Sequence, residues 1–235
     1  MIFSLILAGL AIVYLLSLLW TGYKGFYFPI LIRKAGSGIK KVACVGDSIT
    51  YGYHIDNWFF HNYPYILQVL LGKETYVRNF GLSGSTAMRS AKMSFRRFPN
   101  YRKSVKFLPD AVVIMFGTND ANAQNWKGPE VYTAEYRELL QSYRELPSSP
   151  VIWLMTPPFL LYPQTEEDRS MNEHIRLEQV SVKALAQELD AQVIDLYEKT
   201  KDHPDWFQPD GVHPNAKGAM EIAHIVYDAI KGAGA

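Results

Sequence analysis

The chain has 235 residues, of which 48% are hydrophobic, and this composition is sufficient for one sizeable core. Its 24 Lys and Arg residues nearly balance its 23 Asp and Glu residues. The resulting net charge of +1 argues against a nucleic-acid-binding protein. The single cysteine, Cys44, excludes an internal disulfide, so cysteine usage does not indicate whether the protein lies in an oxidising or a reducing compartment.

The first 21 residues predict a transmembrane anchor. The segment from Ile2 to Trp20 contains 19 residues without a single charge. At about 1.5 Å per residue, a helix of this length nearly spans a bilayer core of about 30 Å. A cleaved signal peptide is the main alternative, but no basic residue precedes the segment and no A-x-A pattern follows it. A buried core helix is a weaker alternative, because the segment is apolar on every face.

Residues 22–39 predict a juxtamembrane linker. Tyr23, Phe26 and Tyr27 suit the aromatic belt of a membrane interface, and Gly36–Ser37–Gly38 suits a flexible hinge. Three basic residues follow the apolar segment and none precedes it: Lys24, Arg33 and Lys34. The positive-inside rule then favours a cytoplasmic domain. A glycan substrate in the envelope or outside the cell would require the opposite orientation, so the side of the membrane stays open.

Residues 40–235 predict one globular domain in which short apolar runs alternate with longer amphipathic runs. The apolar runs predict strands at 41–46, 75–80, 111–117, 151–155 and 191–196. The amphipathic runs predict helices at 63–72, 133–144, 171–189 and 215–230. This alternation is typical of a three-layer α/β/α fold with a five-stranded, mainly parallel sheet. Right-handed crossovers bring the carboxyl ends of all strands to one edge, where ligands bind.

Four polar motifs fall at this edge or on the last loop. They are Gly46-Asp47-Ser48-Ile49-Thr50 after the first strand, Asn79-Phe80-Gly81-Leu82-Ser83-Gly84 after the second, Gly117-Thr118-Asn119-Asp120 after the third, and Asp210-Gly211-Val212-His213-Pro214 before the last helix. Because the fold brings all four motifs to one edge, we expect their side chains to form a common site.

These residue types can together catalyse acyl transfer. The hydroxyl of Ser48 is a poor nucleophile unless a base lies beside it. His213 can be that base, since imidazole titrates near neutrality, and Asp210 can orient the imidazole and stabilise its charged form. A tetrahedral oxyanion also needs donors, and the N–H groups of Ser48 and Gly84 with the side-chain amide of Asn119 could supply them.

The order and spacing of the motifs resemble the GDSL/SGNH hydrolase family, in which Ser, Gly, Asn and His come from four successive blocks. The resemblance extends from about residue 40 to about residue 230, with Gly-Asp-Ser-Ile in place of Gly-Asp-Ser-Leu in the first block. It implies a flavodoxin-like SGNH hydrolase domain over 40–235. It also implies that Ser48, Gly84, Asn119 and His213 occupy the four defining positions and that Asp210 completes the triad.

Other polar residues have simpler interpretations. Asp47 and Asp120 are expected to brace their loops as hydrogen-bond acceptors. Ser83 is a rival nucleophile, but Gly-Leu-Ser-Gly-Ser differs from the G-x-S-x-G turn of α/β-hydrolases. Five further histidines lack metal-ligand spacing: His54, His61, His174, His203 and His224. No nucleotide-binding glycine motif occurs, so neither a metal nor a cofactor is expected.

The flanking sequences predict a short acyl substrate. VACVGDSITYG, NFGLSGST, VVIMFGTND, VIDLY and PDGVHPNAKGA resemble sialate O-acetylesterase-like and acetylxylan esterase-like members, which act on small acyl groups of carbohydrates. Trp126 could stack on a sugar ring or pack in the core. The stretch Glu166–Arg169, a solvated loop or a helix start, favours a wet, open cleft. The first alternative is a lysophospholipase or thioesterase, because the apolar segment Pro157–Pro163 could line an acyl channel. The second alternative is a non-enzymatic module anchored in the membrane.

Overall fold

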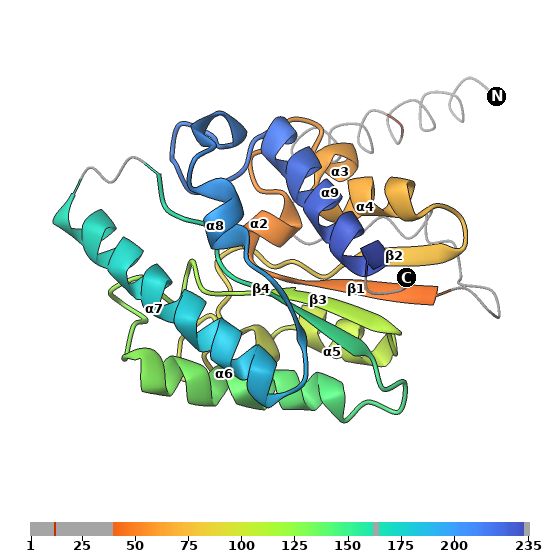
Figure 1. The fold of residues 1–235 in the computed structure, drawn as a ribbon, viewed down its shortest axis with the longest axis horizontal. Coiled ribbons are helices and arrows are strands. Elements are labelled where there is room, and N and C mark those ends of the chain that lie inside the picture. The colour runs from red at the N-terminus through yellow and green to blue at the C-terminus, as the bar shows by residue number, and fades with distance from the viewer. Residues whose placement is uncertain (1–11, 13–39, 162–164, 233–235) are drawn as a thin grey trace, which may run out of the picture. The chain divides into compact units, whose positions relative to one another are not determined.

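The computed structural model describes residues 12, 40–161 and 165–232, which Figure 1 shows as a coloured ribbon. The predicted anchor (1–21) and the predicted linker (22–39) lie outside the described residues, apart from residue 12, so both stay predictions. Among the described residues, no helix combines the length and the apolar composition needed to cross a membrane.

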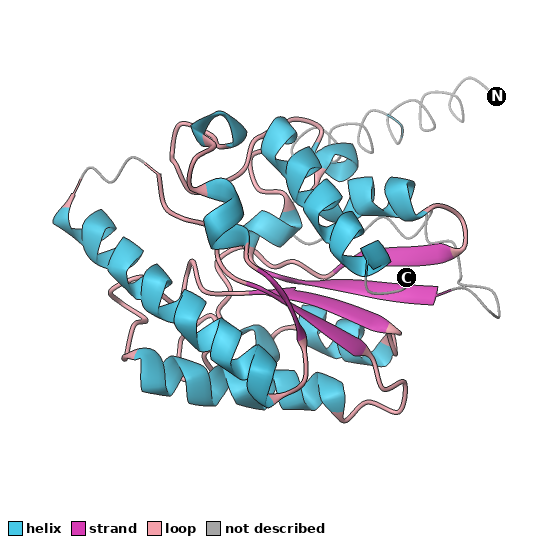
Figure 2. Ribbon diagram, viewed as in Figure 1, coloured by secondary structure: helices cyan, strands magenta, loops and turns pink. Residues whose placement is uncertain are grey.

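Five parallel strands form a single sheet in the described part of the chain. They are β1 (Lys40–Gly46), β2 (Thr75–Asn79), β3 (Ala111–Met115), β4 (Val151–Met155) and β5 (Gln192–Ile194). Their order is β2-β1-β3-β4-β5, and every neighbouring pair is parallel. Figure 2 shows the sheet between two layers of helices. The predicted three-layer α/β/α fold with a five-stranded parallel sheet is therefore confirmed.

Alternate residues of the strands contribute to two separate hydrophobic cores, one on each face of the sheet. On β1, Ala43 and Val45 join one core, whereas Val42 and Cys44 join the other. The same alternation along β3 divides its fully buried residues Val112 to Met115 between the two cores. Both faces of the sheet are covered, which is why these strands are continuous apolar runs rather than alternating ones.

Helices cover each face of the sheet. One layer contains α4 (Tyr63–Leu71) and α9 (Ala216–Gly232), and the other contains α5 (Pro99–Lys106), α6 (Pro129–Arg144) and α7 (Glu166–Glu188) (Figure 1). Helix α5 is missing from the sequence-based prediction. Only Tyr101 and Val105 of this short basic helix pack on the core, so it has too few apolar residues for a recognisable period.

Two long helices begin earlier than the apolar periodicity predicts. Helix α6 starts at Pro129, where the fixed φ of proline suits the first helical turn. Helix α7 starts at Glu166, after a capping box in which Thr165 and Asp168 bond each other's backbone N–H groups. The charged stretch 166–169 is therefore the first turn of a helix.

Short elements fill the connections around the sheet. They are α2 (Ser48–Tyr51), α3 (Trp58–His61), η2 (Phe95–Arg97), α8 (Leu196–Thr200) and η3 (Pro204–Trp206). Helix α2 follows β1 directly and α8 follows β5. Because all strands are parallel, these two helices lie at the carboxyl edge of the sheet, where the polar motifs also lie.

Candidate active site

Ser48 is the first residue of α2 and follows the carboxyl end of β1. Asp47 is the N-cap of this helix, and its Oδ1 accepts the N–H of Ile49 at 2.9 Å. The carbonyl of Ser48 accepts the N–H groups of Gly52 at 2.9 Å and Tyr53 at 3.0 Å. This tight strand-to-helix turn holds Ser48 at the sheet edge, where the residue is only 6% exposed.

Ser48, His213 and Asp210 form one hydrogen-bonded chain. The Nε2 atom of His213 lies 2.9 Å from Ser48 Oγ, although the two residues are 165 positions apart. On the other side of the ring, Nδ1 lies 2.8 Å from Asp210 Oδ2. An Nδ1–H donated to the carboxylate leaves the Nε2 lone pair free to accept the serine hydroxyl. The structure thus brings together three residues that the sequence predicted would meet.

The loop that carries His213 also holds Asp210 in its ionised form. Asp210 Oδ1 accepts the N–H groups of Val212 and His213, both at 2.9 Å. Partial burial acts to raise the pKa of Asp210, but these two bonds and the bond to the His213 ring together outweigh it and lower the pKa. Gly211 has φ 67°, and a Cβ there would come within 2.1 Å of the Leu161 carbonyl oxygen, so only glycine fits.

Gly84 and Asn119 lie on two neighbouring loops that are bonded to each other. The Nδ2 atom of Asn119 donates to the Ser85 carbonyl at 3.1 Å, and Ser85 follows Gly84 directly. Ser85 Oγ in turn donates to the Gly46 carbonyl at 3.4 Å, two residues before Ser48. Within the described ranges, the N–H groups of Ser48 and Gly84 have no hydrogen-bond acceptor. These two N–H groups and the second amide proton of Asn119 are therefore without an acceptor among the described residues, on segments that are bonded to one another.

Two buried aspartates brace these loops, as the sequence predicted. Asp120 accepts the N–H groups of Met88 at 2.9 Å and Ala87 at 3.1 Å, while Asp47 caps α2. Burial raises the pKa of both carboxyls to about 7, against the opposing effect of their backbone hydrogen bonds. Both groups therefore retain their protons up to about neutral pH.

Glu178 is a third buried carboxyl that the sequence analysis missed. It is 0% exposed, and neither carboxyl oxygen has a hydrogen-bond partner among the described residues. Burial raises its pKa well above the ordinary value, and the nearby Asp120 and Asp47 raise it further. A signal existed, because helical spacing from Ile175 and Val182 puts Glu178 on the buried stripe of α7.

The remaining candidates make other contacts or lack a base. Trp126 stacks on His174 with ring centroids 4.4 Å apart and also packs against the larger core. In the segment after β4, Leu160 packs with Ala121 and Ile175 in a small apolar cluster. Residues 162–164 of that segment lie outside the described residues. No described histidine is hydrogen-bonded to the hydroxyl of Ser83, the rival nucleophile.

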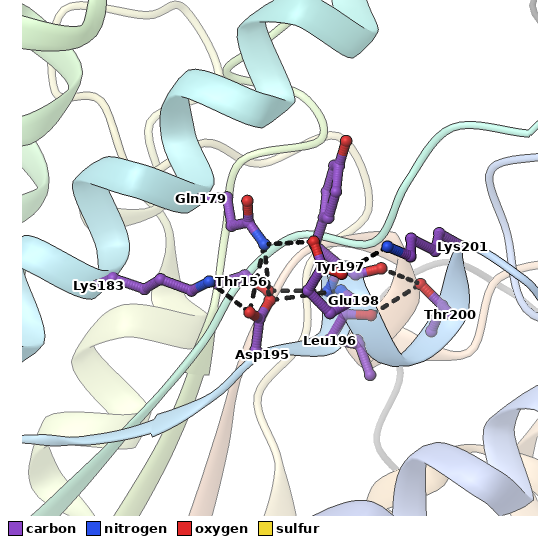
Figure 3. A network of polar contacts seen from close by, with 9 residues as sticks. All are labelled: Thr156, Gln179, Lys183, Asp195, Leu196, Tyr197, Glu198, Thr200 and Lys201. Atoms are coloured by element: carbon purple, nitrogen blue, oxygen red, sulfur yellow. Dashed lines mark hydrogen bonds and ion pairs between the residues drawn. The ribbon is translucent and has the colours of Figure 1, made fainter.

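A polar network holds α8 in place (Figure 3). Asp195, after β5, accepts from Thr156 Oγ1 at 3.1 Å, from Gln179 Nε2 at 3.0 Å and from Lys183 Nζ at 2.5 Å. Tyr197 of α8 packs on the same small apolar cluster as Val212, which lies between Asp210 and His213. The network joins α7, the residue after β4 and α8.

Comparisons with known proteins agree with this architecture. A sequence profile described as the GDSL-like lipase/acylhydrolase family matches residues 44–220. An acetylxylan esterase of Xylanibacter ruminicola is 30% identical over 87% of this chain and 48% of that protein, so the chain spans about half the length of this relative.

Solved structures show the same fold. A carbohydrate acetylesterase family member from Sinorhizobium meliloti has a TM-score of 0.67 at 22% identity, covering 83% of this chain and 98% of the other. A lipase/acylhydrolase from Enterococcus faecalis has a TM-score of 0.64 at 25% identity, covering 83% of this chain and 97% of the other. At these identities the likeness is one of architecture, and the activity has to be argued from the site.

Proposed function

The chain belongs to the GDSL-like lipase/acylhydrolase family, and we propose that it is a serine esterase that removes short acyl groups, foremost O-acetyl groups, from a carbohydrate. The observation that carries the proposal is the hydrogen-bonded chain from Ser48 through His213 to Asp210, with distances of 2.9 and 2.8 Å. This arrangement pairs a nucleophile with a base, and the base with an orienting carboxylate.

In the proposed reaction, Ser48 Oγ attacks the ester carbonyl carbon while its proton passes to His213 Nε2. Asp210 stabilises the imidazolium that forms. The negative carbonyl oxygen accepts hydrogen bonds from the N–H groups of Ser48 and Gly84 and from the second amide proton of Asn119. Collapse of this intermediate expels the alcohol, which takes the proton from His213. Water then hydrolyses the acyl-enzyme by the same two steps and releases the acid.

The buried carboxyls suit this proposed chemistry. Asp47 and Asp120 directly adjoin Ser48 and Asn119, and Glu178 interacts electrostatically with both aspartates. A negative charge in that buried region would oppose the charge that develops on the carbonyl oxygen. Because burial keeps these carboxyls protonated up to about pH 7 or beyond, the oxyanion would form without that repulsion.

The preference for a short acyl group rests on two observations. The relative from Xylanibacter ruminicola is an acetylxylan esterase. In addition, Pro157, Pro158, Leu160 and Leu161 of the apolar segment after β4 are buried, with Leu160 in the small cluster, so this part of the segment behaves as core. A deep acyl channel would need those side chains to line an opening instead.

A chain-length series of p-nitrophenyl esters, from acetate to octanoate, tests the acyl preference with the purified full chain. We expect kcat/KM to fall as the acyl chain grows, and we expect release of acetate from acetylated xylo-oligosaccharides. A channel would instead contribute about 0.8 kcal/mol per buried methylene, so kcat/KM would rise steeply with length. A rising series would replace the proposal with the lipid-directed alternative.

We also propose that residues 1–21 anchor the protein in a membrane, as their uncharged apolar sequence predicts. The full chain should then resist extraction from membranes by carbonate. A chain that fractionates as a soluble protein would contradict the anchor. Protease accessibility in intact cells would decide on which side of the membrane the catalytic domain lies.

A further inference from the structure

The loop Phe207–Asn215, here called the base loop, carries both Asp210 and His213. Gln208 lies near its start and is half-buried. The two ends of the loop pair through an antiparallel bridge between Phe207 and Pro214. Within it, the N–H of Gln208 donates to the His213 carbonyl at 2.8 Å. The backbone of Gln208 is therefore part of the turn that presents His213.

The side chain of Gln208 connects the base loop to the segment that carries Ser48. Its Nε2 donates to the Pro214 carbonyl at 2.9 Å and to the Tyr53 carbonyl at 3.0 Å, across 155 positions of sequence. The N–H of Tyr53 in turn donates to the Ser48 carbonyl at 3.0 Å. With the bond that Ser48 Oγ donates to His213 Nε2, these contacts close a ring of hydrogen bonds.

Few other contacts could hold the two sides at this separation. Among the described residues, the Gln208 amide and the His213 ring make the hydrogen bonds that join the base loop to residues 47–54. The Tyr53 ring lies against the His213 ring, with centroids 4.9 Å apart, but this contact is not directional enough to set a distance. On its far side the base loop is held by the N–H of Leu161, which donates to the Gly211 carbonyl.

We propose that Gln208 is a positioning residue that sets the distance between Ser48 Oγ and His213 Nε2. The inference rests on the proposed esterase function and adds a residue to it. Both partners of the Gln208 side chain are carbonyl oxygens, so the position requires one group that donates two N–H bonds. A primary amide supplies this group at the required reach. A carboxylate would repel both oxygens, and an apolar side chain would leave both without a donor.

Gln68 is a matched control for this role. It is also half-buried, and its Nε2 also donates to two backbone carbonyls, those of Gly72 and Thr75, both at 3.0 Å. These bonds link the end of α4 to the start of β2, away from the carboxyl edge of the sheet. Gln68 Oε1 also accepts the N–H of Val77 at 2.9 Å, so Gln68→Met loses the same two amide donations as Gln208→Met and one further bond. Only the bonds of Gln208 span the site.

The first experiment compares these two variants in the full chain. We expect Gln208→Met to lower kcat about 10- to 100-fold with KM nearly unchanged, because small misplacements of reacting groups slow catalysis by such factors. Labelling of Ser48 by a fluorophosphonate should slow in parallel. Gln68→Met should lower the urea midpoint at least as much while kcat stays at the wild-type value. Equal kcat in both variants and the wild type would overturn the proposal.

Gln208→Glu adds a pH signature that a general loss of stability would not produce. The introduced carboxyl can donate one hydrogen bond when it is protonated and none when it is ionised. The ratio of variant to wild-type kcat/KM should therefore rise as the pH falls from about 8 to about 5. The neighbouring titratable groups are His213 and Asp210 on the base loop and Tyr53 and His54 opposite. A pH-independent ratio would contradict the positioning role of the two Gln208 hydrogen bonds, here called the Gln208 clamp.

A readout that needs no turnover separates this proposal from the proposed function. In protein labelled with ¹⁵N-histidine, loss of the clamp should move the His213 Nε2 resonance toward that of an unbonded ring nitrogen. If the wild type hydrolyses no ester but Gln208→Met still moves this resonance, the proposed esterase function is wrong and the Gln208 clamp is supported. If the wild type is active and the resonance does not move, the clamp is wrong.

Discussion

The candidate site has a nucleophile side, formed by the segments that carry Ser48, Gly84 and Asn119, and a second side formed by the base loop. The two sides shift the pKa of an aspartate in opposite directions. On the nucleophile side, Asp47 is 1% exposed, and burial raises its pKa to about 7. On the base loop, the side chain of Asp210 is 41% exposed, and hydrogen bonds from His213 and Val212 outweigh its partial burial and lower its pKa. Two aspartates close to the reacting groups thus differ in charge at slightly acidic pH, because their surroundings differ and not their chemistry.

The two sides also differ in what holds them. Asp120 is fully buried and accepts two backbone N–H groups from the loop that follows Gly84, and Asn119 bonds the same loop. The base loop is instead held through Gln208 and the contact between Leu161 and Gly211. Loss of the Asp120 or Asn119 side chain should therefore affect folding as well as turnover, whereas substitutions on the base loop should mainly affect turnover.

The largest effect should come from Ser48→Ala on the nucleophile side. Loss of a serine nucleophile lowers kcat by about 10⁶-fold in a hydrolase that depends on it. The fold should persist, because the Ser48 hydroxyl bonds only the His213 ring among the described residues. Ester hydrolysis and fluorophosphonate labelling measure the loss. Substantial remaining activity, or labelling of Ser83, would show that Ser48 is not the nucleophile.

The next largest effect should come from Asp210→Asn on the base loop. An amide cannot stabilise the imidazolium and favours the wrong ring tautomer, so kcat should fall by about 10⁴-fold. The amide oxygen can still accept the N–H groups of Val212 and His213, so the urea midpoint should change little. Kinetics and urea denaturation of the same preparation check both points. A large loss of stability would mean that the base loop is as tightly coupled to folding as the nucleophile side.

A smaller effect is expected from Asn119→Ala. Loss of one oxyanion donor lowers kcat by about 10²–10³-fold and leaves KM nearly unchanged. The variant also loses the bond to the Ser85 carbonyl, so a modest loss of stability should accompany it. Steady-state kinetics separates the two roles. An increase in KM at constant kcat would mean that Asn119 binds the substrate in its ground state.

The smallest effect on turnover, but the clearest on stability, is expected from Asp47→Asn. An unfolded aspartate loses its proton near pH 4, whereas the folded protein holds the Asp47 proton up to about pH 7. The wild type therefore loses stability between these values, and the loss is complete above them. The asparagine variant avoids that loss, so its urea midpoint relative to the wild type should rise from pH 4 to 7 and then level off. Substitution of the exposed Asp56 by Asn is the control and should give no such rise. If the relative urea midpoint of Asp47→Asn did not rise either, Asp47 would be exposed to solvent rather than buried.

The sequence by itself determined the sheet and the edge at which the site lies. Its apolar runs are long enough to be buried on both faces, and parallel crossovers leave the strand ends at one edge. The sequence alone therefore places Ser48, Gly84 and Asn119 at that edge. Helix α5 was missed because only two of its residues pack on the core.

Only the tertiary structure decided the charges and the supports of the site. Helical spacing puts Glu178 on the buried stripe of α7, but only the folded chain places it near Asp47 and Asp120. Gln208 precedes its motif without any pattern around it, so its role could not be assigned from local sequence. Burial and hydrogen bonding depend on which distant segments pack over a group. Asp47 is therefore protonated and Asp210 ionised at slightly acidic pH, and Gln208 spans two segments, for reasons that appear only once the chain is folded.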